Sequence, residues 1–179
     1  MSLLRNRWLA VLVLAAVGAA TSGMASAADP NLYFGAKFGV MSSDHSGYDD
    51  SWNLGGVVGY HFLDFNKGKS RYGTLSGEVE LTVPVVKGDV NPNGDWKAWT
   101  IGAFAVYHSP DFSNVYFKGK AGAVHRDVTS SPSGLPGTGT SFDPAFGAGV
   151  GFRLNRRNSI ELEATFMDTL TFLSAGFVF

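Results

Sequence analysis

The sequence contains no cysteine. This absence excludes disulfide bonds and metal sites with thiolate ligands, and it excludes lipidation of an N-terminal cysteine. It is also typical of a chain that crosses an oxidising compartment, where a free thiol would be oxidised.

Long apolar runs are missing beyond the first part of the chain, so no later segment is expected to span a bilayer as a helix. The one long apolar run extends from Trp8 to about Ala20, behind Arg5 and Arg7. The segment Ala25-Ser26-Ala27 then has the small-x-small pattern of a signal peptidase site. We therefore predict a cleaved export signal over residues 1–27 and a mature domain over residues 28–179.

An excess of positive charge is also absent. The formal net charge is −1 for the whole chain, and removal of residues 1–27 brings it to about −3, with 12 basic against 15 acidic residues. Nucleic-acid binding requires a concentrated basic surface, so this function class is not expected. Helix-forming residues are sparse after the signal, whereas 23 glycines and 13% aromatic residues indicate strands joined by tight turns.

The mature chain divides into eight segments of about ten residues. The predicted strands cover residues 31–41, 52–64, 71–84, 96–108, 114–126, 143–154, 158–167 and 170–179. Long polar breaks at 42–51, 85–95 and 127–142 alternate with short ones at 65–70, 109–113 and 155–157, and only the last connection, Asp168-Thr169, is short where a long one is expected. Strands of ~9–11 residues can cross a bilayer at a tilt, and such loop alternation is typical of outer-membrane barrels.

Apolar and polar residues alternate along most of these segments. In 158–167, for example, Ile160 and Leu162 oppose Glu161 and Glu163, whereas both faces of 96–108 are largely apolar. A soluble β-sandwich or a soluble lipocalin-like barrel would also alternate. With an export signal and strands of this length, however, we expect the apolar rows to face lipid, where the sheet must close because an open edge is too costly.

The sequence therefore predicts an all-β fold, an eight-stranded antiparallel transmembrane up-and-down β-barrel. Its charged face becomes the lumen, which eight strands leave just wide enough for side chains to fill. The predicted network of lumen charges consists of Lys37, Glu78, Glu80, Lys118, Lys120, Arg126, Arg153, Glu161 and Glu163.

Three segments carry a resemblance to a known family. Leu173, Ala175, Phe177 and Phe179 alternate up to the terminal phenylalanine, and the segments 116–122 (YFKGKAG) and 146–154 (FGAGVGFRL) precede them. In these segments the chain resembles the small outer-membrane β-barrel proteins that include the OmpA transmembrane domain and the opacity-type surface antigens.

The resemblance implies an integral outer-membrane protein with both termini in the periplasm and long loops outside. It also implies that the barrel-assembly machinery recognises the four alternating C-terminal residues and that periplasmic chaperones bind the chain before insertion. Lipid and lipopolysaccharide of the outer membrane are the expected surroundings, and we expect a monomer.

Two polar segments raise the question of metal binding. Asp89, Asn91, Asn93 and Asp95 match the start of a calcium loop, in which alternate oxygen ligands surround a glycine turn. The twelfth position is Thr100 instead of glutamate, which favours a polar hairpin tip. The loop with Asp44, His45, Asp49 and Asp50 is likewise expected to be a solvated loop. We predict no metal and no cofactor.

Two further patterns have structural explanations. Gly147, Gly149 and Gly151 alternate within a strand and are not followed by a helix, so they make room for inward side chains and do not form a phosphate loop. Aromatic residues near strand ends predict interfacial girdles. These residues are Phe34, Trp52, Phe62, Trp96, Trp99, Tyr107, Phe152 and Phe166.

Three functions stay open. The first is a non-enzymatic surface protein with a structural role or with loops that mediate adhesion, and we expect no catalytic residue. The second is a lipid A-modifying enzyme, although none of the histidines, His45, His61, His108 and His125, begins the His-x-Ser pair of the deacylase type. The third is a narrow channel for ions or small solutes along the charged lumen.

Overall fold

The computed structural model describes residues 29, 31–65, 72–92, 94–131, 137–155 and 157–179. The chain divides into the units Met1–Leu32 and Tyr33–Phe179, and the predicted export signal lies outside the described residues. The strands are β1 (Leu32–Ser43), β2 (Ser51–Asp64), β3 (Thr74–Val86), β4 (Gly88–Val90), β5 (Gly94–His108), β6 (Val115–Ser131), β7 (Gly139–Arg153), β8 (Ser159–Met167) and β9 (Leu170–Val178). Within the described residues, no helix is long and apolar enough to cross a membrane.

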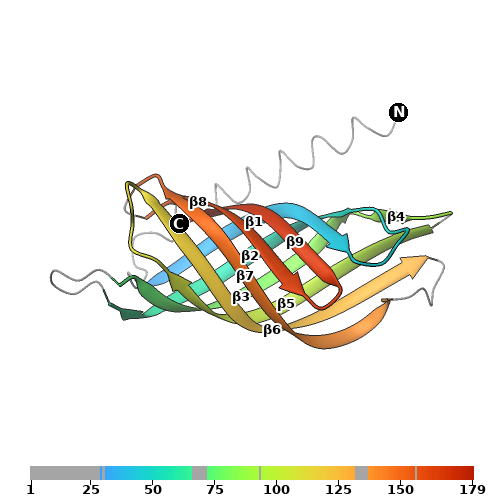
Figure 1. Ribbon diagram of the computed structural model, residues 1–179, viewed down its shortest axis with the longest axis horizontal. Helices are drawn as coiled ribbons and strands as arrows, with labels where there is room; N and C mark the ends of the chain where they lie inside the picture. Colours follow the sequence, from blue (N-terminus) through green and yellow to red (C-terminus); the bar gives the residue numbers. More distant parts are fainter. Residues whose placement is uncertain (1–28, 30, 66–71, 93, 132–136, 156) are drawn as a thin grey trace. The chain divides into compact units, whose positions relative to one another are not determined.

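Eight of these strands form a closed antiparallel barrel (Figure 1). The order around the sheet is β3-β2-β1-β9-β8-β7-β6-β5, and β3 pairs with β5 to close the ring. The first and last strands also pair, with Lys37 opposite Gly176. The predicted fold class is therefore confirmed. Among the named strands the short β4 pairs with β5, and its Val90 also forms a bridge with Tyr48.

The barrel has two different rims. The hairpin rim carries the connections β1–β2, β3–β5, β6–β7 and β8–β9, and the C-terminal rim carries Phe179 with the connections β2–β3, β5–β6 and β7–β8. The hairpins are longer than predicted, because cross-strand pairing continues into two of the expected loops. Thus Trp96 pairs with Ser130 and Val128 pairs with Gly139. Residues 132–136 of the predicted long loop lie outside the described part.

A buried group of apolar residues, which we call the apolar plug, fills the hairpin half of the lumen and extends along β5 to Val106, which lies opposite Lys120. The plug contains Met41, Val90, Trp96, Ala98, Phe104, Val106, Val124, Val128, Ala145, Met167, Leu170 and Phe172. It explains why both faces of β5 are apolar, since Phe104 and Val106 point into the plug whereas Ile101 and Tyr107 are exposed on the outer face.

The plug also corrects one predicted aromatic position. Trp96 is not part of an interfacial girdle, because its side chain is fully buried and its Nε1–H donates to the carbonyl oxygen of Asp49 at 2.6 Å. The β1–β2 connection that contains Asp49 folds against β4: Asp49 N donates to Asp89 O at 2.8 Å, and Asn91 N donates to Gly47 O at 2.9 Å. This connection and β4 thus form a small layer at the hairpin rim.

The plug predicts different costs for truncating inward and outward phenylalanines. Phe172 is 2% exposed, so Phe172→Ala should leave a cavity and lower the free energy of unfolding by about 3–5 kcal/mol. Phe166 is 46% exposed on the outer face, where lipid can fill the vacated space, so Phe166→Ala should cost less. Urea unfolding of the barrel in lipid vesicles measures both, and equal losses would contradict the plug.

Candidate functional site

Seven ionised side chains from four strands meet in the lumen, and we call them the charge network. On each strand they occupy alternate positions, which point to the same face of the sheet. They are Lys37 on β1, Glu78 and Glu80 on β3, Lys118 and Lys120 on β6, and Glu161 and Glu163 on β8. Sequence alternation predicted the inward direction of all seven.

The lysines and glutamates of the network form continuous ion pairs. Lys37 Nζ lies 2.6 Å from Glu80 Oε1 and 2.8 Å from Glu163 Oε1, and Lys120 Nζ lies 2.7 Å from each of the same two side chains. The exposed fraction of every side chain in the network is at most 7%. Removal of one partner from such buried pairs leaves an uncompensated charge, which is strongly destabilising.

Lys118 joins the remaining acids to this centre. Its Nζ lies 2.9 Å from Glu78 Oε1, 3.0 Å from Glu161 Oε2 and 3.1 Å from Glu163 Oε2. No other lysine pairs with Glu78 or Glu161 in the described part of the chain. Lys118 is therefore the residue on which the charge compensation of these two acids depends.

Two tyrosines complete the network toward the C-terminal rim. Tyr33 Oη donates to Glu78 Oε1 at 2.7 Å, and Tyr116 Oη donates to Glu161 Oε1 at 2.6 Å. Each ring lies over a glycine of the neighbouring strand, because a Cβ on Gly59 would collide with Tyr33 and a Cβ on Gly151 would collide with Tyr116. These glycines therefore make room for tyrosines, whereas Gly147 makes room for Lys120, as expected.

Two histidines lie beside the tyrosines, and the four rings form what we call the aromatic–histidine layer. The ring centroids of Tyr33 and His61 are 4.6 Å apart in a stacked arrangement. His108 contacts His61 edge-to-face at 5.6 Å and Tyr116 at 5.6 Å. From the C-terminal rim toward the hairpin rim, the lumen thus contains the aromatic–histidine layer, the charge network and the apolar plug. The network meets the plug where Lys120 Nζ lies 4.2 Å from the centroid of the Phe104 ring.

Two of the nine predicted network residues lie elsewhere. Arg126 is buried near the hairpin rim, where it pairs with Asp143 at 2.6 Å and Asp168 at 3.1 Å. Arg153 pairs with Asp111 at 2.8 Å on the C-terminal rim, and both side chains are 38% exposed. The alternation placed both arginines on the inward face, but it carries no information on depth along the strand, which decides the partners.

The network is built from two similar halves. In the first half, Tyr33 donates a hydrogen bond to Glu78, 45 residues later, and Lys37 donates to Glu80, 43 residues later. In the second half, Tyr116 donates to Glu161 and Lys120 donates to Glu163, at the same two separations. The sequence shows the signal, since Tyr-Phe-x-x-Lys-x-Gly begins at residues 33 and 116, and Ser-x-Glu-x-Glu-x-Thr begins at residues 76 and 159.

The strand registers of the two halves agree with this sequence repeat. Gly59 lies opposite Glu78, and Gly151 lies opposite Glu161. Lys118 is the main exception, because the equivalent residue in the first half is Gly35. A search for internal repeats would have found Tyr33 and Tyr116 as network residues, which the pattern of charges alone did not reveal.

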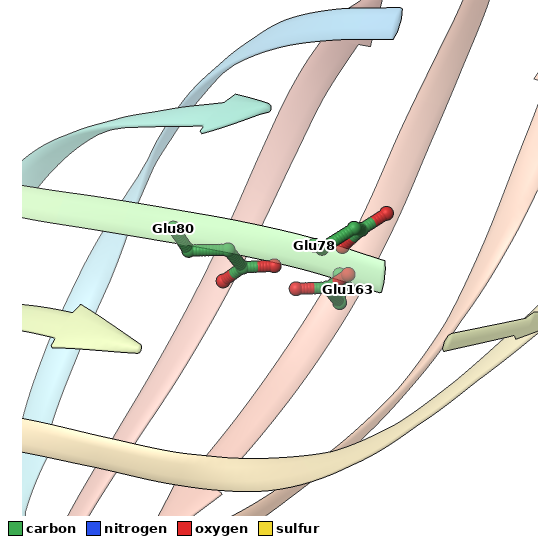
Figure 2. Close-up of side chains that lie close together, drawn as sticks. All are labelled: Glu78, Glu80 and Glu163. Carbon is green, nitrogen blue, oxygen red and sulfur yellow. The ribbon is translucent and has the colours of Figure 1, made fainter. Parts of the chain in front are cut away.

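The structure brings three carboxylates close together. One oxygen each of Glu78, Glu80 and Glu163 lie within 4.8 Å of one another, and the three side chains extend into the same part of the lumen (Figure 2). Lys37, Lys118 and Lys120 already bind these carboxylates. The cluster is therefore better described as an ion-pair network than as a metal site.

The predicted calcium-loop residues form part of a hairpin. Asp89 lies opposite Asp95 in the pairing of β4 with β5, and Asp95 Oδ2 accepts from Lys87 Nζ at 2.6 Å. Asn93 lies outside the described residues. A calcium loop curls around the ion so that its oxygen ligands converge. Here the backbone is paired as two strands, and Asp95 binds a lysine.

Two serine–histidine pairs bear on the enzyme hypothesis. His61 Nδ1 lies 2.6 Å from Ser76 Oγ inside the lumen, and His45 Nδ1 lies 3.3 Å from Ser43 Oγ at the hairpin rim. Ser76 is fully buried. A lipid substrate on the outer face of the barrel would therefore not reach the closer of the two pairs.

The predicted assembly residues lie on the outer face of β9. Leu173 is 61% exposed and Phe177 is 40% exposed, and Ala175 is exposed between them. Phe179 exchanges two backbone hydrogen bonds of 2.9 Å with Phe34.

Comparisons with known proteins agree with this architecture. A family model described as "Outer membrane protein beta-barrel domain" matches residues 9–176. The chain belongs to this family. The protein is accordingly an integral outer-membrane protein, as the resemblance implied. No curated protein matches the chain.

Solved structures with the same fold include Neisserial surface protein A, with a TM-score of 0.55 and 21% identity over 82% of this chain and 94% of that one. OprG from Pseudomonas aeruginosa has a TM-score of 0.52 and 15% identity over 83% and 94%. A designed transmembrane β-barrel has a TM-score of 0.51 and 14% identity over 86% and 97%. These similarities show a shared fold for this outer-membrane barrel.

The position of Lys118 predicts a large effect of its removal. Lys118→Met should lower the free energy of unfolding by about 3–5 kcal/mol, because Glu78 and Glu161 lose the one lysine partner that each has among the described residues. Adding Glu161→Gln should recover part of this loss. Arg153→Met removes a partly exposed pair and should cost at most about 1 kcal/mol. Urea unfolding in vesicles compares the three, and equal costs for Lys118→Met and Arg153→Met would contradict the network.

Proposed function

We propose that this protein is a non-enzymatic surface protein that acts through its hairpin rim, with the barrel as a rigid membrane support. The observation that carries the proposal is the packing of the lumen. The aromatic–histidine layer, the charge network and the apolar plug follow one another along the barrel. Because these side chains occupy the lumen, the surface we expect to meet an extracellular partner is the hairpin rim.

The long strands at the hairpin rim support this role. The strands β5, β6 and β7 have 15, 17 and 15 residues, whereas ~9–11 are sufficient to cross a bilayer. The surplus length presents paired β-hairpins beyond the membrane. Because these hairpins are hydrogen-bonded, they lose less conformational entropy on binding than irregular loops of the same length would.

The charge of the hairpin rim favours a basic partner. Its turns and strand ends carry three basic residues, Lys87, Lys97 and Arg126, and eight aspartates. The aspartates are Asp44, Asp49, Asp50, Asp89, Asp95, Asp127, Asp143 and Asp168. A surface of one dominant sign attracts partners of the opposite sign and gives binding that weakens with salt.

The surroundings and orientation of the barrel belong to the same proposal. We place the C-terminal rim in the periplasm and the hairpin rim outside, with lipid and lipopolysaccharide around a monomeric barrel. Periplasmic chaperones deliver the chain, and the barrel-assembly machinery binds the exposed row of Leu173, Ala175 and Phe177 with the terminal Phe179. The resemblance to small outer-membrane barrels supports these assignments.

A closed lumen predicts the absence of conductance. Purified refolded protein in planar bilayers should give no discrete channel steps, because the apolar plug offers no polar path. A porin reconstituted in the same bilayers serves as the positive control. Reproducible steps that disappear in a variant of the charge network would instead support the channel alternative.

Shortening one hairpin tests the role of the rim. Replacement of residues 129–138 by an Asn-Gly turn joins Val128 to Gly139, which lie opposite each other in β6 and β7, and keeps Val128 in the plug. The variant should still fold, shown by heat-modifiable gel migration, and should lose adhesion of cells to basic surface-coating proteins. A matched deletion in the β7–β8 connection at the C-terminal rim, of residues 155–157, should leave adhesion unchanged. Unaltered adhesion after loss of the hairpin would refute the proposed role of this rim segment.

A further inference from the structure

We infer that the aromatic–histidine layer is a binding site for one divalent transition-metal ion of the zinc class, with His61 and His108 as its protein ligands. This site is distinct from the hairpin rim and does not depend on the proposed surface role. Imidazole nitrogens are preferred ligands of Zn²⁺, Ni²⁺ and Cu²⁺.

The two imidazoles have a spacing suited to one shared ion. Their ring centroids are 5.6 Å apart, and the ring planes make an angle of 77°. Two imidazoles on the same ion place their ring centres about 5–6 Å apart, since each Zn–N bond is about 2 Å long. The rings come from different strands, His61 from β2 and His108 from β5, so the barrel itself brings them together.

One buried atom of this layer and one of the adjoining charge network have unused hydrogen-bonding capacity. His108 is only 7% exposed, and its Nδ1 is buried without a hydrogen-bond partner among the described residues. Bulk water therefore does not replace the missing partner. Glu78 Oε2 is likewise buried without a hydrogen-bond partner in the described part of the chain. A buried polar atom without a partner is costly, and a cation bound at His108 Nδ1 would satisfy that atom.

Ser76 prepares His61 for coordination. Ser76 Oγ and His61 Nδ1 lie 2.6 Å apart. In the tautomer in which Nδ1–H donates to the serine, Nε2 keeps a free lone pair. Metal-binding histidines usually have such a partner on the nitrogen that does not bind the ion. His61 is also partly exposed, which gives an ion access from the C-terminal rim.

The comparison of the two halves shows where positive charge is missing. In the second half, the Arg153 guanidinium lies 5.2 Å from the centroid of the Tyr116 ring. Arg153 follows Gly151, the glycine under Tyr116, by two residues. In the first half, the residue two positions after Gly59 is His61, whose ring stacks on Tyr33. An ion on His61 would therefore supply the charge that Arg153 supplies to the other tyrosine.

The charge count of the network agrees with this inference. Four glutamates face three lysines in the lumen, which leaves a formal charge of −1. An unbalanced charge in a medium of low dielectric constant is unfavourable. A divalent cation beside Glu78 would offset this excess of negative charge, with water or an anion in its remaining coordination positions.

Zinc titration of untagged, refolded protein in detergent micelles tests the site. Calorimetry should show one Zn²⁺ per barrel, and binding should weaken at least ~10-fold in His61→Phe and in His108→Phe, which keep an aromatic ring but remove the nitrogens. Ser76→Ala should weaken it about 10-fold. Binding should also decrease as the pH falls, because protons compete with the metal for imidazole.

The other two histidines supply matched controls. His45→Ala and His125→Ala alter residues of the hairpin half and should leave the lumen site unchanged. Heat-modifiable migration verifies folding of each variant. If a lumen variant does not fold, the NMR spectrum of the wild-type protein shows which histidines bind zinc. Zinc should then shift the side-chain nitrogen signals of His61 and His108 and leave those of His45 and His125 unchanged. Zinc binding that is absent in the wild type, unchanged in folded His61→Phe and His108→Phe, or confined to His45 and His125 overturns the inference.

Discussion

Burial of seven charged side chains within a membrane-embedded barrel is the constraint on which the rest of this structure depends. Neither lipid outside nor the apolar plug can solvate these charges, so each must find its partner across the lumen. The short contacts of Lys37 and Lys120 with Glu80 and Glu163 show how opposite walls of the barrel are joined. The tyrosines and glycines around them follow from the space and the donors that this arrangement requires.

The internal repeat explains how so compact a network is specified. Each half contributes a tyrosine, a lysine and two glutamates in the same order and with the same pairing of strands. The two repeat units contribute to the same lumen, and acids of one half lie beside lysines of the other, as in the pairs Lys37–Glu163 and Lys120–Glu80. Lys118 breaks this symmetry and adds a third base, while Arg153 and His61 occupy equivalent positions with different charge.

The layered lumen also separates the functions of the two ends. The plug and the small layer formed by β4 and the β1–β2 connection isolate the charges from the hairpin rim, where aspartates dominate. At the other end, His61 retains partial exposure and gives access to the aromatic–histidine layer. A surface role at one rim and metal binding at the other are therefore compatible within one closed barrel.

Which side chains face inward could be predicted from the amino-acid pattern, because a strand repeats every two residues and a charge on the lipid face is too costly. The closed eight-stranded fold and the outer-membrane location followed from this alternation and the family resemblance. Partner choice was decided only by tertiary structure, since it depends on strand stagger and depth in the lumen. This is why Arg126 and Arg153 pair with aspartates, why Trp96 is buried in the plug, and why His61 meets His108 from another strand.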